Sequence, residues 1–308
     1  MVTPFNDKHE FDLDEEFDYF QDFSPSNGLR DQVVELLDAR DAECLRELLA
    51  AEPSPVSLEI DEYHEAITLL AEALASNTTV TSLSLMNQQQ DESAREEARD
   101  QDGNLMRRIA EMLQRNSTLT KLLLPSNEVT DKSACPLAEV LKSNSTLKTL
   151  SLSNNEIKNE GAMQLAGMLR VNSTLTSLDL FCNYVKNKGA MQLADVLTVN
   201  STLRFLSVAY SVIKPAGISA FAAALKINST LRTLHLHKNL LDDESMDQVL
   251  AALQNNGSLT QLTLSTYQPE SHPCLERNEY NVLAKEQTLF SMLLSIHHQI
   301  LRDIDFED

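Results

Sequence analysis

The stretch NSTLKTLSLSNNEIKNEGAMQLAGMLRV, residues 144–171, decides the fold because it recurs along the chain at a constant interval. Its first four residues, Asn-Ser-Thr-Leu, are found every 28 residues, beginning at Asn116, Asn144, Asn172, Asn200 and Asn228. A variant at Asn256 continues the interval, and an earlier variant at Asn77 lies 39 residues before Asn116. Self-similarity at a fixed period indicates a solenoid in which each unit packs on the next one.

Each unit has two halves with different periods. In the first half, Leu147, Leu150 and Leu152 follow the pattern Leu-x-x-Leu-x-Leu, which predicts a short strand with one buried face. In the second half, small and apolar residues such as Ala162 and Leu165 mark one face of a helix. A strand followed by a helix at a fixed interval predicts parallel strands lining the inside of a curved stack, with helices outside.

This pattern resembles the ribonuclease-inhibitor-like class of leucine-rich repeats, whose unit is a strand and a helix in 28 residues. Residues 77–266 carry the resemblance. It implies an α/β leucine-rich-repeat solenoid, or horseshoe, with parallel strands on the concave face, helices on the convex face and helical caps. It also implies protein binding on the concave face or a rim. The class includes inhibitors, innate-immune sensors, GTPase-activating proteins, actin-filament cappers and bacterial effectors.

Two kinds of asparagine recur in the repeat. The one that ends Leu-x-x-Leu-x-Leu-x-x-Asn is predicted to satisfy turn backbone groups inside the stack. Ser211 replaces it in the fifth full repeat and Tyr267 in the last, so we expect an altered turn near 208–216 and the end of regular repetition at 267. The asparagine that begins Asn-Ser-Thr-Leu is predicted to adopt a left-handed backbone in the turn from helix to strand.

The segments around the repeats suggest a division of the chain into four parts. Residues 1–27 form an acidic, aromatic tail, and 28–55 are predicted to be a helical cap. Residues 56–266 carry the repeats, including a first degenerate unit and a charged insertion at 91–103, and 267–308 are predicted to be a C-terminal helical cap. The tail either docks on a partner, lies along its own solenoid or stays disordered, and in the first case Phe17, Tyr19 and Phe20 would bind the partner.

Strand alternation sends the third, fifth and seventh residues of Leu-x-x-Leu-x-Leu-x to the concave face. Most of them are small and polar. The exceptions come from three adjacent repeats and form our candidate for a partner-binding surface, together with Asp179: Phe181, Phe205, Tyr210, His235 and His237. Exposed aromatic residues beside polar ones are typical of binding hot spots.

No catalytic or metal constellation emerges from the sequence. His235 and His237 point the same way but have no third ligand at suitable spacing, and seven glycines leave little room for a phosphate-binding loop. Cys274 lies near His272, yet no triad is assembled around it. We therefore expect no enzyme activity, no cofactor and no metal. Four scattered cysteines favour a reducing compartment over a disulfide framework, and Cys182 is expected to pack at a turn.

The net charge of −21 argues against nucleic acid as a partner. Residues 1–115 hold 27 acidic and 9 basic residues, whereas 116–266 hold 11 and 13. This acidic end could steer a protein with a basic surface, although it could equally serve solubility. We expect no secretory signal, because the first 20 residues have neither a basic region nor an apolar one, and no stretch of the sequence has the apolar length of a membrane-spanning helix. We expect a monomer in the cytoplasm, or in the host cytosol if the protein is a secreted effector.

The first hypothesis is a non-catalytic protein-binding scaffold or recognition module that acts through the concave face and the acidic N-terminal rim. A narrower version is a translocated bacterial effector. The alternative is a regulator of a small GTPase, of the activating type, or of actin filaments. An assay of nucleotide hydrolysis against a panel of small GTPases would separate these two classes.

Overall fold

The computed structural model describes residues 27–53, 56–61, 67–86 and 105–265. Within them, one sheet of eight parallel strands has the strands in chain order from β1 to β8. The strands are β1 Val56–Asp61, β2 Val80–Met86, β3 Lys121–Leu123, β4 Thr149–Ser151, β5 Ser177–Asp179, β6 Phe205–Ser207, β7 Thr233–His235 and β8 Gln261–Thr263. The monotonic order means that each unit contacts its two neighbours, as a solenoid requires.

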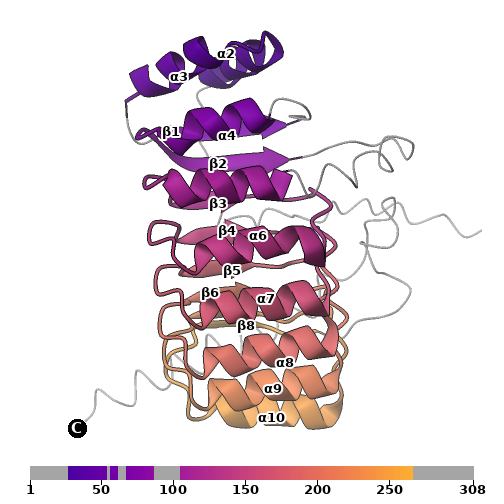
Figure 1. Ribbon diagram of the computed structural model, residues 1–308. Helices are drawn as coiled ribbons and strands as arrows, with labels where there is room; N and C mark the ends of the chain where they lie inside the picture. Colours follow the sequence, from indigo (N-terminus) through magenta and orange to yellow (C-terminus); the bar gives the residue numbers. More distant parts are fainter. Residues whose placement is uncertain (1–26, 54–55, 62–66, 87–104, 266–308) are drawn as a thin grey trace, which may run out of the picture.

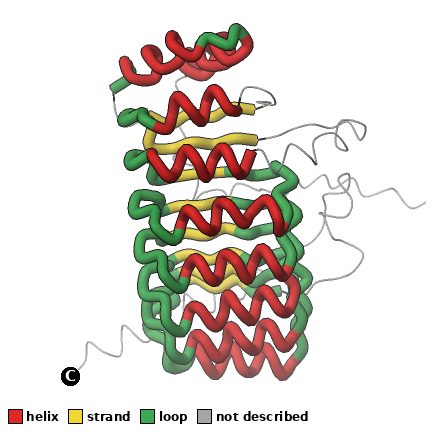
Figure 2. Tube along the Cα trace, in the orientation of Figure 1, coloured by secondary structure: helices red, strands yellow, loops and turns green. Residues whose placement is uncertain are grey.

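The helices form a second layer that stacks beside the sheet (Figures 1 and 2). They are α2 Asn27–Asp38, α3 Ala42–Ala51, α4 Ile67–Ala75, α6 Asp131–Leu141, α7 Asn159–Leu169, α8 Lys186–Leu197, α9 Pro215–Leu225 and α10 Asp243–Leu253, and residues 105–115 are also helical. Parallel strands joined by right-handed crossovers in chain order place the crossover helices on one face of the sheet. We call the opposite face the concave face. The predicted α/β solenoid is therefore confirmed.

One continuous hydrophobic core lies between the strands and the helices. The central leucine of each short strand belongs to it, for example Leu150, Leu178 and Leu206, each with no exposed surface. Its neighbours in the strand point to the concave face, because successive side chains of a strand alternate. The predicted assignment of residues to the two faces of the strands is confirmed at these positions.

Asn155 shows what the asparagine after each strand does. Its Oδ1 accepts the backbone N–H groups of Asn127 and Val129 at 3.0 and 2.9 Å. Its Nδ2 donates to the carbonyl oxygens of Leu124 and Leu152, both at 2.9 Å, and also to that of Ser153. The side chain thus satisfies backbone groups of its own turn and of the preceding one, where water has no access. Asn127, Asn183 and Asn239 make contacts of the same kind, so the prediction for this position is confirmed.

The asparagine that begins Asn-Ser-Thr-Leu uses its side chain in another way. In Asn172, Oδ1 accepts the N–H groups of Thr174 and Leu175 at 2.9 and 2.7 Å, while Nδ2 donates to the carbonyl oxygen of Leu141 at 2.6 Å. Most left-handed residues of the repeats lie elsewhere, directly before the turn asparagine or the serine that replaces it at 211: Ser126, Asn154, Cys182, Tyr210 and Lys238, with φ between 51 and 57°. The prediction of a left-handed backbone at Asn-Ser-Thr-Leu is wrong, because the side-chain hydrogen bonds close that turn by themselves.

The backbone differs from the other repeats both in the turn that contains Ser211 and in the turn before it. The Ser211 and Ile213 N–H groups still donate to Asn239 Oδ1, at 3.2 and 3.0 Å. Ser211, however, has no carboxamide that can reach back to the turn at 183–186. There the Lys186 N–H donates to the Ser211 carbonyl oxygen at 3.0 Å, and Lys186 is left-handed with φ of 50°. Val212 is also left-handed, with φ of 54°. The altered turn predicted at 208–216 is therefore confirmed, and the change extends to the preceding turn at 183–186.

We expect Ser211→Asn to stabilise the protein by about 1 kcal/mol, as replacements toward a repeat consensus commonly do. The new carboxamide would reach the backbone groups of the turn after β5, as Asn155 reaches those after β3. Chemical denaturation followed by circular dichroism measures the change, with Ser211→Ala as the control. A variant less stable than the wild type would show that the turn at 183–186 has no room for the hydrogen bonds of the new carboxamide.

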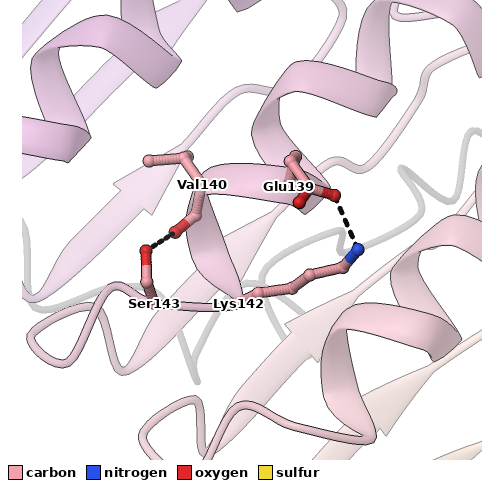
Figure 3. Close-up of polar contacts among 4 residues, drawn as sticks. All are labelled: Glu139, Val140, Lys142 and Ser143. Carbon is pink, nitrogen blue, oxygen red and sulfur yellow. Dashed lines mark hydrogen bonds and ion pairs between the residues drawn. The ribbon is translucent and has the colours of Figure 1, made fainter.

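The helix ends are closed by local side chains. At the C-terminal end of α6, the Ser143 hydroxyl donates to the Val140 carbonyl oxygen at 3.2 Å, and Lys142 Nζ contacts Glu139 Oε2 at 2.6 Å (Figure 3). The Val140 carbonyl oxygen also accepts the N–H groups of Ser143 and Asn144, at 3.2 and 3.1 Å, so the hydroxyl adds to the backbone hydrogen bonds that close this helix end. At the start of α10, Asp242 accepts the Ser245 N–H, and this bond holds the pKa of Asp242 below its ordinary value.

The N-terminal segment that the sequence predicts to be one helix is two. Helices α2 and α3 are separated at Arg40, which is left-handed with φ of 56°, and Asp41 caps α3 by accepting the Cys44 N–H. Helix α2 contacts β1, and α3 contacts α4. Capping of the first repeat stays a prediction. The tail, the insertion at 91–103 and the segment 267–308 lie outside the described residues.

Candidate protein-binding surface

The candidate surface lies on the concave face over β5, β6 and β7. In the register of β5, β6 and β7, Ser177, Phe205 and Thr233 lie side by side in one row. Asp179, Ser207 and His235 form a second row. These residues alternate with the core leucines and therefore share the face that the helices do not cover. Phe181, Tyr210 and His237 follow the three strands at the same edge.

Five rings form one connected group, which we call the ring cluster: Phe181, Phe205, Tyr210, His235 and His237. Tyr210 meets Phe181 and His237 edge-on, with centroids 5.2 and 5.7 Å apart. Phe205 meets His235 edge-on at 5.2 Å, and His235 joins the two halves through His237 at 6.0 Å. Edge-to-face contacts at these distances are attractive. The prediction that these residues cluster across adjacent repeats is confirmed.

Asp179 holds one side of the ring cluster in place. Its Oδ1 accepts the Phe181 N–H at 2.9 Å, and its Oδ2 accepts the Ser151 hydroxyl at 2.8 Å. The carboxylate therefore fixes the backbone that carries the Phe181 ring and ties β5 to β4. On the other side, His237 Nδ1 lies 2.8 Å from the Thr263 hydroxyl, which links the cluster to β8.

The exposure of these residues differs from the prediction. Only Phe181 and Tyr210 are partly exposed. Phe205, His235 and His237 have 2, 5 and 4% of their surface exposed, and Asp179 has 6%. The expectation that these four are exposed is wrong, because a strand pattern predicts the direction of a side chain but not what lies above it. Their role in partner binding stays a prediction.

Two hydroxyls that the sequence did not single out lie buried beside the ring cluster. Ser177 Oγ and Ser207 Oγ have no hydrogen-bond partner among the described parts of the chain. Ser177 is in register with Phe205, and Ser207 is in register with Asp179 and His235. Buried hydroxyls without a partner are rare and costly. Strand alternation places both residues on this face, but no pattern in the sequence predicts that they are buried.

The cysteines also differ from the prediction. Cys44 and Cys135 are free and exposed, whereas Cys182 is buried and disulfide-bonded. Cys182 directly follows Phe181, at the edge of the ring cluster. The expectation that Cys182 packs at a turn is confirmed, since it is buried in the turn after β5, but its bonded state contradicts the expectation of unpaired cysteines. Cys274 and His272 lie outside the described residues. So do Phe17, Tyr19 and Phe20, the candidates for partner binding in the tail.

Across the described ranges, no group of three or more His, Cys, Asp or Glu residues is arranged to hold a metal ion. In the same ranges, no helix is both long and apolar enough to cross a membrane. A second surface feature that the sequence did not indicate lies in the turns after α7, α8 and α9, where three aliphatic residues at the same repeat position are each about 60% exposed: Val171, Val199 and Ile227.

Comparison with known proteins agrees with the repeat geometry. Residues 143–166, 171–194 and 199–222 match the family model described as Leucine Rich repeat. The chain therefore contains leucine-rich repeats, and its described part is a leucine-rich-repeat solenoid. No curated protein matches the chain.

Two solved structures overlap with parts of it. One is titled Leiomodin-1 Actin-Binding Site 2, with 26% identity, a TM-score of 0.36, and coverage of 41% of this chain and 73% of that one. The other is the TLR13–ssRNA13 complex, with 14% identity, a TM-score of 0.41, and coverage of 76% of this chain and 36% of that one. The assignment of the fold rests on the repeat itself.

Proposed function

We propose that this protein is a non-catalytic protein-binding scaffold whose contact surface is the ring cluster on the concave face over β5 to β7. The observation that carries the proposal is the ring cluster, in which five side chains from three repeats make mutual edge contacts. Interfaces concentrate their binding energy in a few aromatic residues set among polar ones. Leucine-rich repeats are typically binding modules, which supports the same reading.

The finer points of the proposal come from the sequence. A partner with a basic surface would suit the acidic N-terminal region. Cytoplasmic location, a monomeric state and the role of a translocated effector are further parts of the proposal. Regulation of a small GTPase or of actin filaments is the alternative, and the nucleotide-hydrolysis assay against small GTPases tests its first half directly.

Changing Phe181 to Asp is expected to lower partner capture about tenfold, which corresponds to loss of one moderate hot-spot residue. Phe181 is suited to this test because it is partly exposed, so the new carboxylate does not have to enter the core. The measurement is affinity capture from a lysate under reducing conditions, with the fold verified by circular dichroism.

Ile227→Asp is the matched control, because it places the same charge at an exposed aliphatic residue in the turn after α9, away from the ring cluster. It should leave capture unchanged. Equal capture by wild type and Phe181→Asp would contradict the proposal. Loss of capture in Ile227→Asp alone would move the contact surface to the turns after the helices.

A further inference from the structure

In the regular repeats, the turns that lead from each helix into the next strand differ in charge from the rest of the chain. The strands are parallel and in register, so these turns lie along one side of the stack and the strand-to-helix turns along the other (Figure 2). We call the first side the basic edge, and it comprises residues 116–121, 142–149, 170–177, 198–205, 226–233 and 254–261. It contains no acidic residue, although the whole chain has 46. Its basic residues are Lys121, Lys142, Lys148, Arg170, Arg204, Lys226 and Arg232.

The opposite side of the stack has no such bias. Its turns, from the residue after each strand to the first residue of the helix, are 124–131, 152–159, 180–186, 208–215 and 236–243. They contain five acidic and four basic residues. The positive charge therefore belongs to one side of the solenoid and not to its turns in general.

Two acidic residues at the ends of helices neutralise part of this charge. Glu139 Oε2 lies 2.6 Å from Lys142 Nζ, and Asp195 Oδ2 lies 2.5 Å from Arg170 Nη2. Both pairs are exposed, and exposed ion pairs are weak and screened by salt. A carboxylate of a bound molecule can therefore compete for these two basic side chains.

The remaining charge is concentrated in a row at the start of the strands. The Thr176 N–H donates to the Lys148 carbonyl oxygen at 2.8 Å, the Arg204 N–H to that of Thr176 at 2.7 Å, and the Arg232 N–H to that of Arg204 at 2.7 Å. Lys148 and Arg204 form no ion pair with the described residues. Neighbouring strands are about 4.8 Å apart, so Arg204 and Arg232 start from adjacent backbone positions. Like charges held this close repel each other, and a bound carboxylate would relieve the repulsion.

The helix side of the basic edge carries a ridge of aliphatic side chains. Val171, Val199 and Ile227 each follow the C-cap of a helix and are 60, 59 and 64% exposed. The repeats on either side have Ser143 and Asn255 at this position, so the ridge spans three repeats. Single exposed aliphatic residues are ordinary, but a row of them beside fixed positive charges is typical of an interaction surface.

The spacing of the ridge suits a helix. Helices α7, α8 and α9 pack against one another, and packed helices lie about 8–10 Å apart. Asn200 and Asn228 fix this spacing at the ridge, because their Nδ2 atoms donate to the carbonyl oxygens of Leu169 and Leu197, both at 2.7 Å. In an α-helix, residues seven apart lie on one face and are separated by about 10.5 Å. In an extended peptide, residues three apart have a similar separation but point to opposite faces.

We propose that the basic edge binds an acidic amphipathic helix of another protein. The apolar stripe of this helix packs on the ridge of Val171, Val199 and Ile227. Its carboxylates pair with the basic row, foremost with Arg204 and Arg232. The proposal goes beyond the proposed function, because this surface lies on the side of the stack and shares no residue with the ring cluster.

An anionic membrane fits the same surface less well. Residues 1–115 hold 27 acidic and 9 basic residues, and a membrane along the side of the stack would also face its acidic N-terminal units. A short helix on the three repeats of the ridge stays away from those units, and charges more than about 8–10 Å away are largely screened at physiological salt.

A labelled model peptide tests the proposal on the full-length protein. The probe is a fluorescein-labelled helix of about 18 residues, with leucines on one face and glutamates and alanines on the other. One comparison peptide has the same residues in scrambled order, and another has lysines in place of the glutamates. Fluorescence anisotropy should show saturable binding of the acidic helix, and binding at least about tenfold weaker for both comparison peptides. No saturable binding of the acidic helix, or equal binding of the basic one, would overturn the proposal.

Variants of the edge locate the binding. Ile227→Asp and Arg204→Glu should each weaken binding of the acidic helix about tenfold. Met163→Asp and Lys188→Glu are the matched controls, since both residues are exposed and lie in the N-terminal halves of α7 and α8, away from the basic edge. They should leave the affinity unchanged, with the fold of all four variants verified by circular dichroism. Equal losses in the controls and the edge variants would show unspecific attraction and refute the site.

Two further measurements identify other occupants. Cosedimentation with phosphatidylserine vesicles measures membrane binding, and analytical ultracentrifugation without peptide measures self-association. If Ile227→Asp reduces either of these while the acidic helix does not bind, the surface belongs to a membrane or to a second copy, and the proposal fails.

The two binding surfaces are separable. Phe181→Asp should leave binding of the model helix unchanged, whereas Ile227→Asp should leave capture through the ring cluster unchanged. Failure of the proposed function would therefore not alter the peptide measurements, and failure at the basic edge would not alter capture by the ring cluster.

Discussion

Asn155→Ala should lower the free energy of unfolding by about 4 kcal/mol, because several buried backbone groups lose their partner and each unsatisfied group costs about 1–3 kcal/mol. The Asn127 and Val129 N–H groups lose the Oδ1 acceptor, and the carbonyl oxygens of Leu124 and Leu152 lose the Nδ2 donor. Asn155 is 4% exposed, so water does not replace these contacts without opening the stack. Chemical denaturation followed by circular dichroism measures the change.

The neighbouring Asn154 offers a control in the same turn. It is exposed, and its contact is one hydrogen bond from its Nδ2 to the Ser126 hydroxyl. Asn154→Ser introduces the residue type that the preceding repeat has at this left-handed position, so the stability should change by less than about 1 kcal/mol. Equal losses in the two variants would contradict the role assigned to the buried asparagine.

Hydrogen exchange adds a spatial test of the same prediction. In a solenoid each unit is stabilised by its neighbours, so a defect at one turn weakens the interface on both sides of it. Asn155 bonds across the turns after β3 and β4, and protection should therefore fall in these two units first. Uniform loss of protection along the described repeats would indicate instead that the stack opens as a whole.

The repeat was sufficient to predict the layers of the fold. Leucines such as Leu150 and Leu178 alternate with polar residues at a fixed interval, and burial of one strand face follows from hydrophobicity alone. The register follows as well, because units of equal length stack with equivalent residues side by side. For this reason the sequence alone predicts that Phe181, Tyr210 and His237 lie close to one another.

Other features depend on contacts that no single repeat contains. The left-handed position before the turn asparagine is occupied by Ser126, Asn154, Cys182, Tyr210 and Lys238, and five different residue types give no glycine-like signal of a positive φ. The near-complete burial of Phe205 and His235, which are 2 and 5% exposed, does not follow from strand alternation. The bonded state of Cys182 does not follow from the spacing of the cysteines either.

Gly189→Val should lower the free energy of unfolding by about 3 kcal/mol, at the upper end of what overpacking in a dense interior costs. A Cβ at Gly189 would lie 2.7 Å from the Ala162 Cβ on α7 and 3.0 Å from the Val185 Cγ1. The alanine Cβ has no rotatable bond that could move it away, so α7 and α8 would have to separate.

Gly167→Ala in α7 is the matched control, since a Cβ there meets nothing within 4 Å. It should stabilise the protein by about 0.5–1 kcal/mol through the lower backbone entropy of the unfolded chain. Opposite signs in the two glycine variants would show that close helix packing, rather than backbone freedom, requires glycine at 189. A neutral Gly189→Val would show that the helices tolerate a wider spacing than their contact suggests.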